Sequence, residues 1–135
     1  MILLYGAVKF LAYSAWCHAG LRLAGSSADA ASSLLLGAAR WGIGLLFGIV
    51  IFFAVGSIDA AAAARTYFAV YTPVRIVEWV IMLFVIAVRV QPDSMAMANP
   101  RLRLWCVGGM LVSFLTDVLS PEGVQGRFCV GRCLC

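Results

Sequence analysis

Four long apolar stretches, separated by short polar segments, dominate the sequence. They cover residues 2–23, 34–56, 67–90 and 101–119. The second has no charged residue from Trp41 to Ile58 and gives the clearest apolar signal. A helix needs about 20 apolar residues to cross the hydrocarbon core of a bilayer, so each stretch is long enough, the fourth only just. The pattern therefore predicts an all-α fold: a polytopic integral membrane protein built as a bundle of four transmembrane helices.

Local signals place the ends of these helices. Ser32 and Ser33 are suited to cap the start of the second helix, because serine side chains accept hydrogen bonds from free backbone N–H groups. Pro92 ends the third helix and Pro100 opens the fourth, because proline is tolerated only in the first turn. Lys9 interrupts the first apolar run, so we expect a retained helix there rather than a cleaved export signal. The chain then divides into one domain, residues 1–123, and a short basic, cysteine-rich tail, residues 124–135.

The composition supports a membrane location and excludes other classes of protein. Of the 135 residues, 64% are hydrophobic and 12% are charged, whereas a typical soluble domain is about 45–50% apolar and about 25% charged. The ten Lys and Arg residues are scattered, so they form no patch that would bind a nucleic acid. The net charge of +4 suits contact with anionic lipid head groups. We therefore expect membrane lipid, and no nucleic acid, as a partner.

The distribution of positive charge predicts the orientation of the helices. Four spans place both termini and the second connection on one side of the membrane, and the first and third connections on the other. The side of the first and third connections carries Arg22, Arg40, Arg89, Arg101 and Arg103. The side of the termini carries Arg65, Arg127 and Arg132, and also Lys9 if its side chain reaches the surface. By the positive-inside rule, both termini face away from the cytoplasm, in the inner (cytoplasmic) membrane of a bacterium.

Two charged residues lie near the middle of the third stretch. Arg75 and Glu78 each cost about 2.5–3.5 kcal/mol at the centre of a membrane helix. They are at positions i and i+3, a spacing that brings two side chains together on one face of a helix. Charges at this depth pair, face the interior of a bundle or meet water. We expect both to point inward at a shared, partly hydrated pocket; the alternative is a purely structural role in packing and insertion.

Other polar residues lie at a similar depth, on the side of the termini. The candidate catalytic residues are Glu78, Arg75, Asp117 and Tyr71. An arginine can hold an anionic group or a developing oxyanion, and a buried carboxyl can supply acid–base chemistry. The candidate substrate-binding residues are Lys9, Tyr13 and Ser113. We assign no metal ligand among them and identify no cofactor.

Glycines recur along the second stretch. Gly37, Gly44 and Gly48 are spaced along it, and the last two form a GxxxG pattern. Small residues at this spacing let membrane helices approach closely. We expect this glycine face to pack against another helix.

The histidine and the cysteines give weaker signals. His18 lies near the end of the first stretch, where we expect it to form a hydrogen bond. Cys17 and Cys106 fall within apolar stretches and are expected to be small packing residues. The tail cysteines leave three alternatives open, namely a disulfide, lipidation or capture of a soft metal ion; they are Cys129, Cys133 and Cys135.

No established catalytic motif is present, such as HExxH, GxSxG, a P-loop or GxGxxG. The intramembrane charges are therefore the main functional signal. We expect the protein to bind or act on a lipid or lipid-linked substrate at Arg75 and Glu78, without deciding whether it is an enzyme. The first alternative is a non-catalytic accessory subunit of a larger membrane complex, or a homo-oligomer, docking through the glycine face. The second is a metal or redox carrier that uses the cysteine tail.

Overall fold

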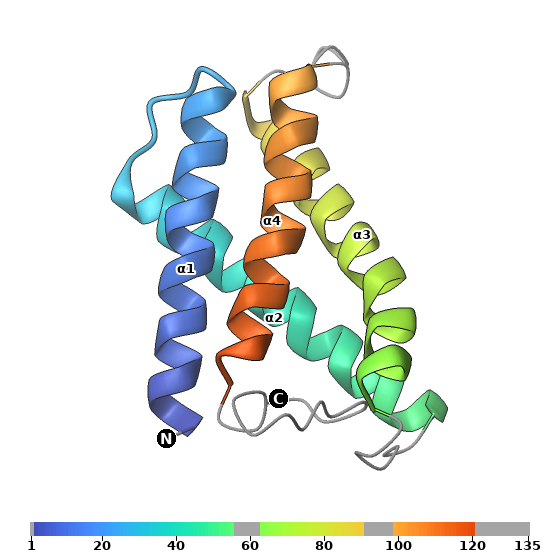
Figure 1. Cartoon of the computed structure of the whole chain (residues 1–135). Coiled ribbons are helices and arrows are strands. Elements are labelled where there is room, and N and C mark those ends of the chain that lie inside the picture. The colour runs from blue at the N-terminus through green and yellow to red at the C-terminus, as the bar shows by residue number, and fades with distance from the viewer. Residues whose placement is uncertain (1, 56–62, 91–98, 121–135) are drawn as a thin grey trace.

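The computed structural model describes residues 2–55, 63–90 and 99–120. These residues form four helices and no strand: α1 (Ile2–Leu23), α2 (Ala30–Val55), α3 (Ala63–Val90) and α4 (Pro100–Val118). The helices alternate in direction, so that α1 begins and α4 ends at the same end of the bundle (Figure 1). The predicted all-α, four-helix architecture is confirmed. Among the described residues, one helix segment, Ala30–Ala54, is long and apolar enough to cross a membrane by length and composition alone.

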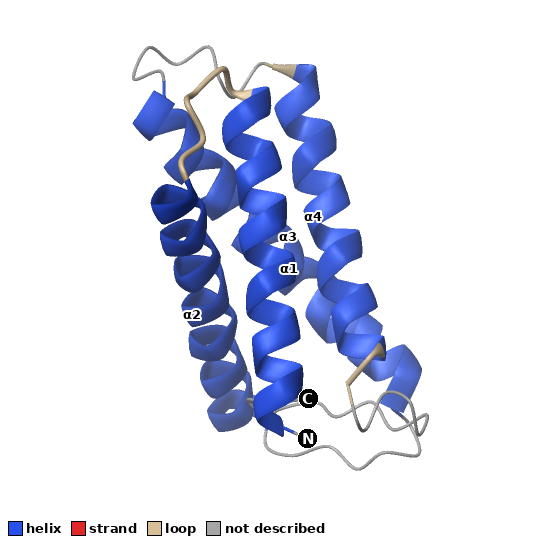
Figure 2. Cartoon of the chain, turned by 90° about the vertical axis from the view of Figure 1, so that its left-hand side faces the viewer, coloured by secondary structure: helices blue, strands red, loops and turns tan. Residues whose placement is uncertain are grey.

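The helices form a closed ring in which each contacts its two neighbours in the chain, and α4 returns to contact α1 (Figures 1 and 2). Large apolar side chains fill the middle of this ring. The most deeply buried are Tyr13, Leu36, Trp79, Met82, Ile86 and Leu102. Trp79 packs edge-on against Trp105 of α4, with ring centroids 5.2 Å apart.

The start of α2 differs from the prediction. The helix begins at Ala30, four residues earlier than expected, and Asp29 caps it: the Asp29 carboxylate accepts a hydrogen bond from the backbone N–H of Ser32 at 3.2 Å. Hydrogen bonds from the Ser32 side chain and then from the backbone favour the charged carboxylate, which holds the pKa of Asp29 below its usual value. The expectation that Ser32 or Ser33 is the cap was wrong, because Asp29 precedes both with a side chain that accepts from free N–H groups.

His18 connects the end of α1 to this first turn of α2. The Ser33 hydroxyl donates to the backbone carbonyl of Asp29 at 2.8 Å, and His18 Nδ1 lies 3.0 Å from the same hydroxyl oxygen. The Ser33 hydroxyl proton is engaged in the bond to the Asp29 carbonyl, so the hydroxyl oxygen accepts a hydrogen bond from His18 Nδ1–H. In the neutral imidazole, this tautomer leaves Nε2 as the unprotonated nitrogen. The predicted hydrogen-bonding role of His18 is confirmed.

A reciprocal pair of tryptophans holds α1 against α4. The Trp16 indole N–H donates to the backbone carbonyl of Trp105 at 3.0 Å, and the Trp105 indole N–H donates to the carbonyl of Trp16 at 2.7 Å. Each ring lies over a glycine of the opposite helix: Gly20 beneath Trp105 and Gly108 beneath Trp16. A side chain three or four residues after a helical carbonyl lies beside it, so these glycines leave the two carbonyls open to the indoles.

Other glycines also make close approaches possible. A Cβ at Gly37 would overlap the backbone and hydroxyl of Ser14 on α1, and a Cβ at Gly109 would lie 2.5 Å from the ring of Trp79. The packing role predicted for Gly37 is therefore confirmed, and the neighbour is a helix of the same chain. Small residues in this position let helix backbones come close enough for dense van der Waals contact.

The cysteines divide into two groups. Cys17 and Cys106 are buried in the core as free thiols, in agreement with the prediction that they are packing residues. Cys129, Cys133 and Cys135 lie outside the described residues. Within the described ranges, no group of three or more His, Cys, Asp or Glu residues is arranged to hold a metal ion.

We expect Gly20→Ala to destabilise the bundle by about 1–3 kcal/mol, because overpacking a dense contact displaces its neighbours. The new Cβ would lie 2.5 Å from the Trp105 ring. Thermal unfolding followed by far-UV circular dichroism measures the effect. Gly6→Ala is the matched control, because a Cβ there meets nothing within 4 Å. Equal melting temperatures for the two variants would contradict the tryptophan–glycine contact.

Candidate functional site

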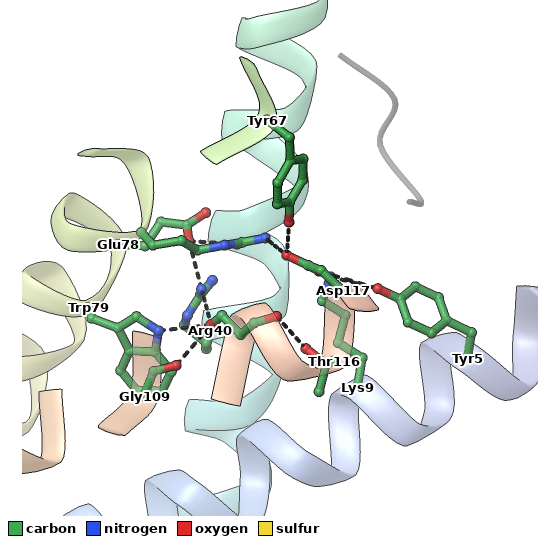
Figure 3. Close-up of polar contacts among 11 residues, drawn as sticks. Tyr5, Lys9, Arg40, Tyr67, Glu78, Trp79, Gly109, Thr116 and Asp117 are labelled. Carbon is green, nitrogen blue, oxygen red and sulfur yellow. Dashed lines mark hydrogen bonds and ion pairs between the residues drawn. The ribbon is translucent and has the colours of Figure 1, made fainter. Parts of the chain in front are cut away.

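Five charged side chains meet inside the bundle, and every helix contributes at least one of them. They are Lys9 of α1, Arg40 of α2, Arg75 and Glu78 of α3, and Asp117 of α4, and we refer to them as the charge cluster (Figure 3). Arg75 and Glu78 point inward, as predicted. Their exposed fractions are 5% and 1%, so both side chains are buried, whereas the Lys9 side chain at the edge of the cluster is 13% exposed.

Asp117 anchors one half of the cluster. Its Oδ1 lies 2.5 Å from Lys9 Nζ and accepts a hydrogen bond from the Tyr5 hydroxyl at 3.3 Å. Its Oδ2 accepts from the Tyr67 hydroxyl at 2.5 Å and from Arg75 Nη2 at 2.7 Å. Both oxygens of this carboxylate are therefore fully engaged, with two cations and two tyrosines as donors.

Glu78 anchors the other half through a single oxygen. Glu78 Oε2 accepts from Arg75 Nη1 at 2.7 Å and from Arg40 Nη2 at 2.6 Å. Arg40 Nη2 also contacts the Ser113 hydroxyl at 3.1 Å, which in turn accepts from the Trp79 indole N–H at 2.9 Å. Arg75 thus donates to both carboxylates and joins the two halves.

Aromatic rings cover the guanidinium groups. The Arg40 guanidinium carbon lies 4.7 Å from the centre of the Tyr13 ring and 5.0 Å from the centre of a ring of the Trp79 indole. Arg75 lies 5.6 Å from the centre of the Tyr71 ring. A desolvated cation over an aromatic face gains about 2 kcal/mol or more. The rings therefore stabilise the buried cations and exclude water from them.

The structure brings together all seven of the candidate catalytic and substrate-binding residues that the sequence singled out. Hydrogen bonds and ion pairs join Lys9, Arg75, Glu78, Ser113 and Asp117, and rings of Tyr13 and Tyr71 lie beside the cations. Their roles in binding or catalysis remain predictions.

Sequence reasoning missed Arg40, Tyr5 and Tyr67. Arg40 was counted among the arginines at the cytoplasmic surface, and this was wrong, because its side chain is 0% exposed. The error follows from the predicted start of α2. Four additional residues at the beginning of the helix place Arg40 about 6 Å deeper along its axis. Asp29, as a helix cap, is the signal that would have corrected it.

The charge cluster is unbalanced and incompletely bonded. Its members are three cations and two carboxylates. Within the described part of the chain, five buried polar atoms have no hydrogen-bond partner: Tyr13 OH, Arg40 Nε, Arg40 Nη1, Arg75 Nε and Glu78 Oε1. An unpaired buried donor or acceptor costs about 1–3 kcal/mol, and more if it is charged. Three of these atoms are guanidinium nitrogens, so the cluster leaves several donors without an acceptor.

We expect Glu78→Gln to lower the free energy of unfolding by about 3–5 kcal/mol, because it removes the partner of two buried guanidinium groups. Adding Arg40→Gln removes one of those cations and restores the original charge difference. The double variant should therefore lose less stability than the sum of the two single variants. Denaturant unfolding of all four proteins gives this coupling energy. Strictly additive losses would mean that Arg40 and Glu78 do not interact.

Comparison with protein-family models, curated proteins and solved structures finds no match to this chain. The function must therefore be argued from the charge cluster and its surroundings.

Proposed function

We propose that the chain is a small integral membrane protein in which all four helices cross the bilayer. The support is an inverted distribution of side chains. Large apolar residues cover the outside, including Leu3, Phe53 and Leu104 with exposed fractions of 90%, 81% and 71%, while charged residues occupy the core. In water this arrangement would leave a large apolar surface exposed and bury costly charges. In a bilayer, the outer apolar residues would contact lipid, and the charged residues would pair with one another inside the bundle.

The same distribution accounts for the modest hydropathy of α1, α3 and α4. Away from the arginines in the first and last turns, the charged residues of these helices belong to the charge cluster, so they face the other helices; they are Lys9, Arg75, Glu78 and Asp117. The shortest helix, α4, has 19 residues, and at 1.5 Å per residue it approaches the hydrocarbon thickness of about 30 Å. In α2, by contrast, only 28% of an 18-residue apolar stretch of the helix is buried within the bundle.

We propose further that the charge cluster binds the anionic head group of a lipid or lipid-linked substrate. The observation that carries this proposal is the excess buried cation, together with unpartnered N–H groups on Arg40 and Arg75. A purely structural ion network would be expected to satisfy its own donors. An anion that accepts from these groups would neutralise the excess charge and supply the missing partners. Glu78 Oε1 is the one unoccupied carboxylate oxygen here, so Glu78 is the candidate base if binding leads to catalysis.

The alternative of an accessory subunit docking through the glycine face has less support. Gly37 and Gly44 face Ser14 and the charge cluster of the same chain. A partner helix would therefore have to use another surface. The proposed carrier role of the cysteine tail concerns residues outside the described ranges.

For the orientation, we expect a reporter that is active only in the cytoplasm to be inactive when fused after Cys135 and active when inserted at Asp93. With Arg40 and Lys9 inside the bundle, the side of the first and third connections still carries more cations. Its four arginines are Arg22, Arg89, Arg101 and Arg103, against Arg65, Arg127 and Arg132. The reverse pattern of activity would invert the proposed topology.

For the binding proposal, the purified protein in phosphatidylcholine nanodiscs should bind added phosphatidylglycerol in preference to further phosphatidylcholine. Native mass spectrometry measures the bound lipid. Arg40→Gln should weaken this binding about tenfold or more, because a hydrogen bond to a charged group contributes about 1.5–3 kcal/mol. Arg101→Gln, which removes the same charge from an exposed position, should leave it unchanged. No preference of the wild-type protein for any anionic lipid would refute the proposal.

A further inference from the structure

Pro73 lies inside α3, which continues through it as a helix. Proline has no N–H, so the helical hydrogen bond from position 73 to the carbonyl of Ala69 is missing, and the proline ring crowds that carbonyl. Bending of a helix is concentrated at such a position. Residues 63–72, which precede the proline, therefore have a hinge between them and the rest of α3.

The two parts of α3 pack into different apolar clusters. Before Pro73, the buried rings of Tyr67 and Tyr71 form a small cluster with Ile51 of α2, and Phe114 of α4 packs against it. After Pro73, the helix contributes five buried residues to the main core, namely Trp79, Met82, Leu83, Ile86 and Ala87. The second part is therefore fixed in the middle of the bundle, whereas residues 63–72 are held by a much smaller set of contacts.

The two tyrosines of this segment lie against the ion pair of Arg75 and Asp117. The Tyr67 hydroxyl donates to Asp117 Oδ2 at 2.5 Å (Figure 3), and the Tyr71 ring centre lies 5.6 Å from the Arg75 guanidinium carbon. The two tyrosine rings are 4.7 Å apart, so they form one aromatic layer. Arg75 itself follows Pro73, so a movement of the tyrosines leaves its ion pairs with Glu78 and Asp117 in place.

The burial of the cluster requires a movement of this kind if a ligand is to enter. Arg75 and Asp117 are each 5% exposed, and Arg75 Nε is one of the buried donors without a partner. We propose that residues 63–72 form a lid, which is hinged at Pro73 and held closed by the hydrogen bond from Tyr67 to Asp117, and which opens to admit an anionic lipid head group to Arg75. This inference rests on the proposed binding of such a head group and specifies how it reaches the site.

The test follows the tyrosines by fluorine NMR, in the full chain labelled with 3-fluorotyrosine and held in phosphatidylcholine nanodiscs. The chain has four tyrosines, at positions 5, 13, 67 and 71, so four resonances report on it. Hinge motions occur on the microsecond-to-millisecond timescale, which relaxation dispersion detects. In the wild-type protein, Tyr67 and Tyr71 should exchange with a minor open state, and Tyr13 in the main core should not.

Two substitutions should shift the population of the open state in opposite directions, with Tyr71 as the reporter. Tyr67→Phe keeps the ring but loses the bond to the carboxylate, and should raise the open population about tenfold or more. Pro73→Ala restores the helical hydrogen bond, and should lower it about threefold or more. Pro100→Ala is the matched control for the second change, because Pro100 lies in the first turn of α4, where no helical bond is lost. Tyr5→Phe removes a donor to the same carboxylate from α1, and should leave the Tyr71 resonance unchanged.

Absence of exchange at Tyr71 in both the wild-type protein and Tyr67→Phe would overturn the lid. Equal effects of Pro73→Ala and Pro100→Ala would overturn the hinge. Phosphatidylglycerol, added as the ligand probe, should raise the open population of the wild-type protein. If the exchange responds to the variants but phosphatidylglycerol does not bind, the lid stands and the binding proposal fails. If phosphatidylglycerol binds in an Arg40-dependent manner without any exchange at Tyr71, the binding proposal stands and the lid fails.

Discussion

The double contact of Arg75 is the interaction on which the rest of the structure depends. One guanidinium group donates to Glu78 on its own helix and to Asp117 on α4. At these distances, in surroundings of low dielectric constant, removal of either carboxylate leaves buried positive charge without a partner. Lys9 and Arg40 then attach α1 and α2 to the same two carboxylates. The relative depth of all four helices is consequently set by one connected group of charges.

Packing around this cluster uses residues that suit the lipid environment proposed for the protein. Lipid provides no hydrophobic force to drive one apolar helix against another, so close van der Waals contact and interhelical hydrogen bonds must hold membrane helices together. The pair formed by Trp16 and Trp105 supplies both, because two glycines let each indole reach a backbone carbonyl. The charge cluster and the tryptophan pair thus stabilise the same arrangement from different levels of the bundle.

The two carboxylates of the cluster differ in how completely they are hydrogen-bonded. Asp117 has donors on both oxygens, whereas Glu78 uses only one of its two. Arg40 Nη1 and Glu78 Oε1, which have no hydrogen-bond partner, both lie beside Gly44 of α2. Rigidly held charges with unused hydrogen-bonding capacity are the arrangement that favours binding, because little further ordering is needed when a ligand arrives. This contrast between the two halves is why we place the proposed binding position near Glu78.

The sequence by itself determined the four helices, because the lengths of the apolar stretches and the intervening polar residues reflect local preferences. It also placed Arg75 and Glu78 together, since their spacing along one helix follows from helical geometry alone. Only the tertiary structure decided that Arg40 joins them and that Tyr5 and Tyr67 bind Asp117. The depth of a residue along its helix can be predicted from the sequence only as accurately as the start of that helix. The rotation of each helix about its axis is set by packing against the other three.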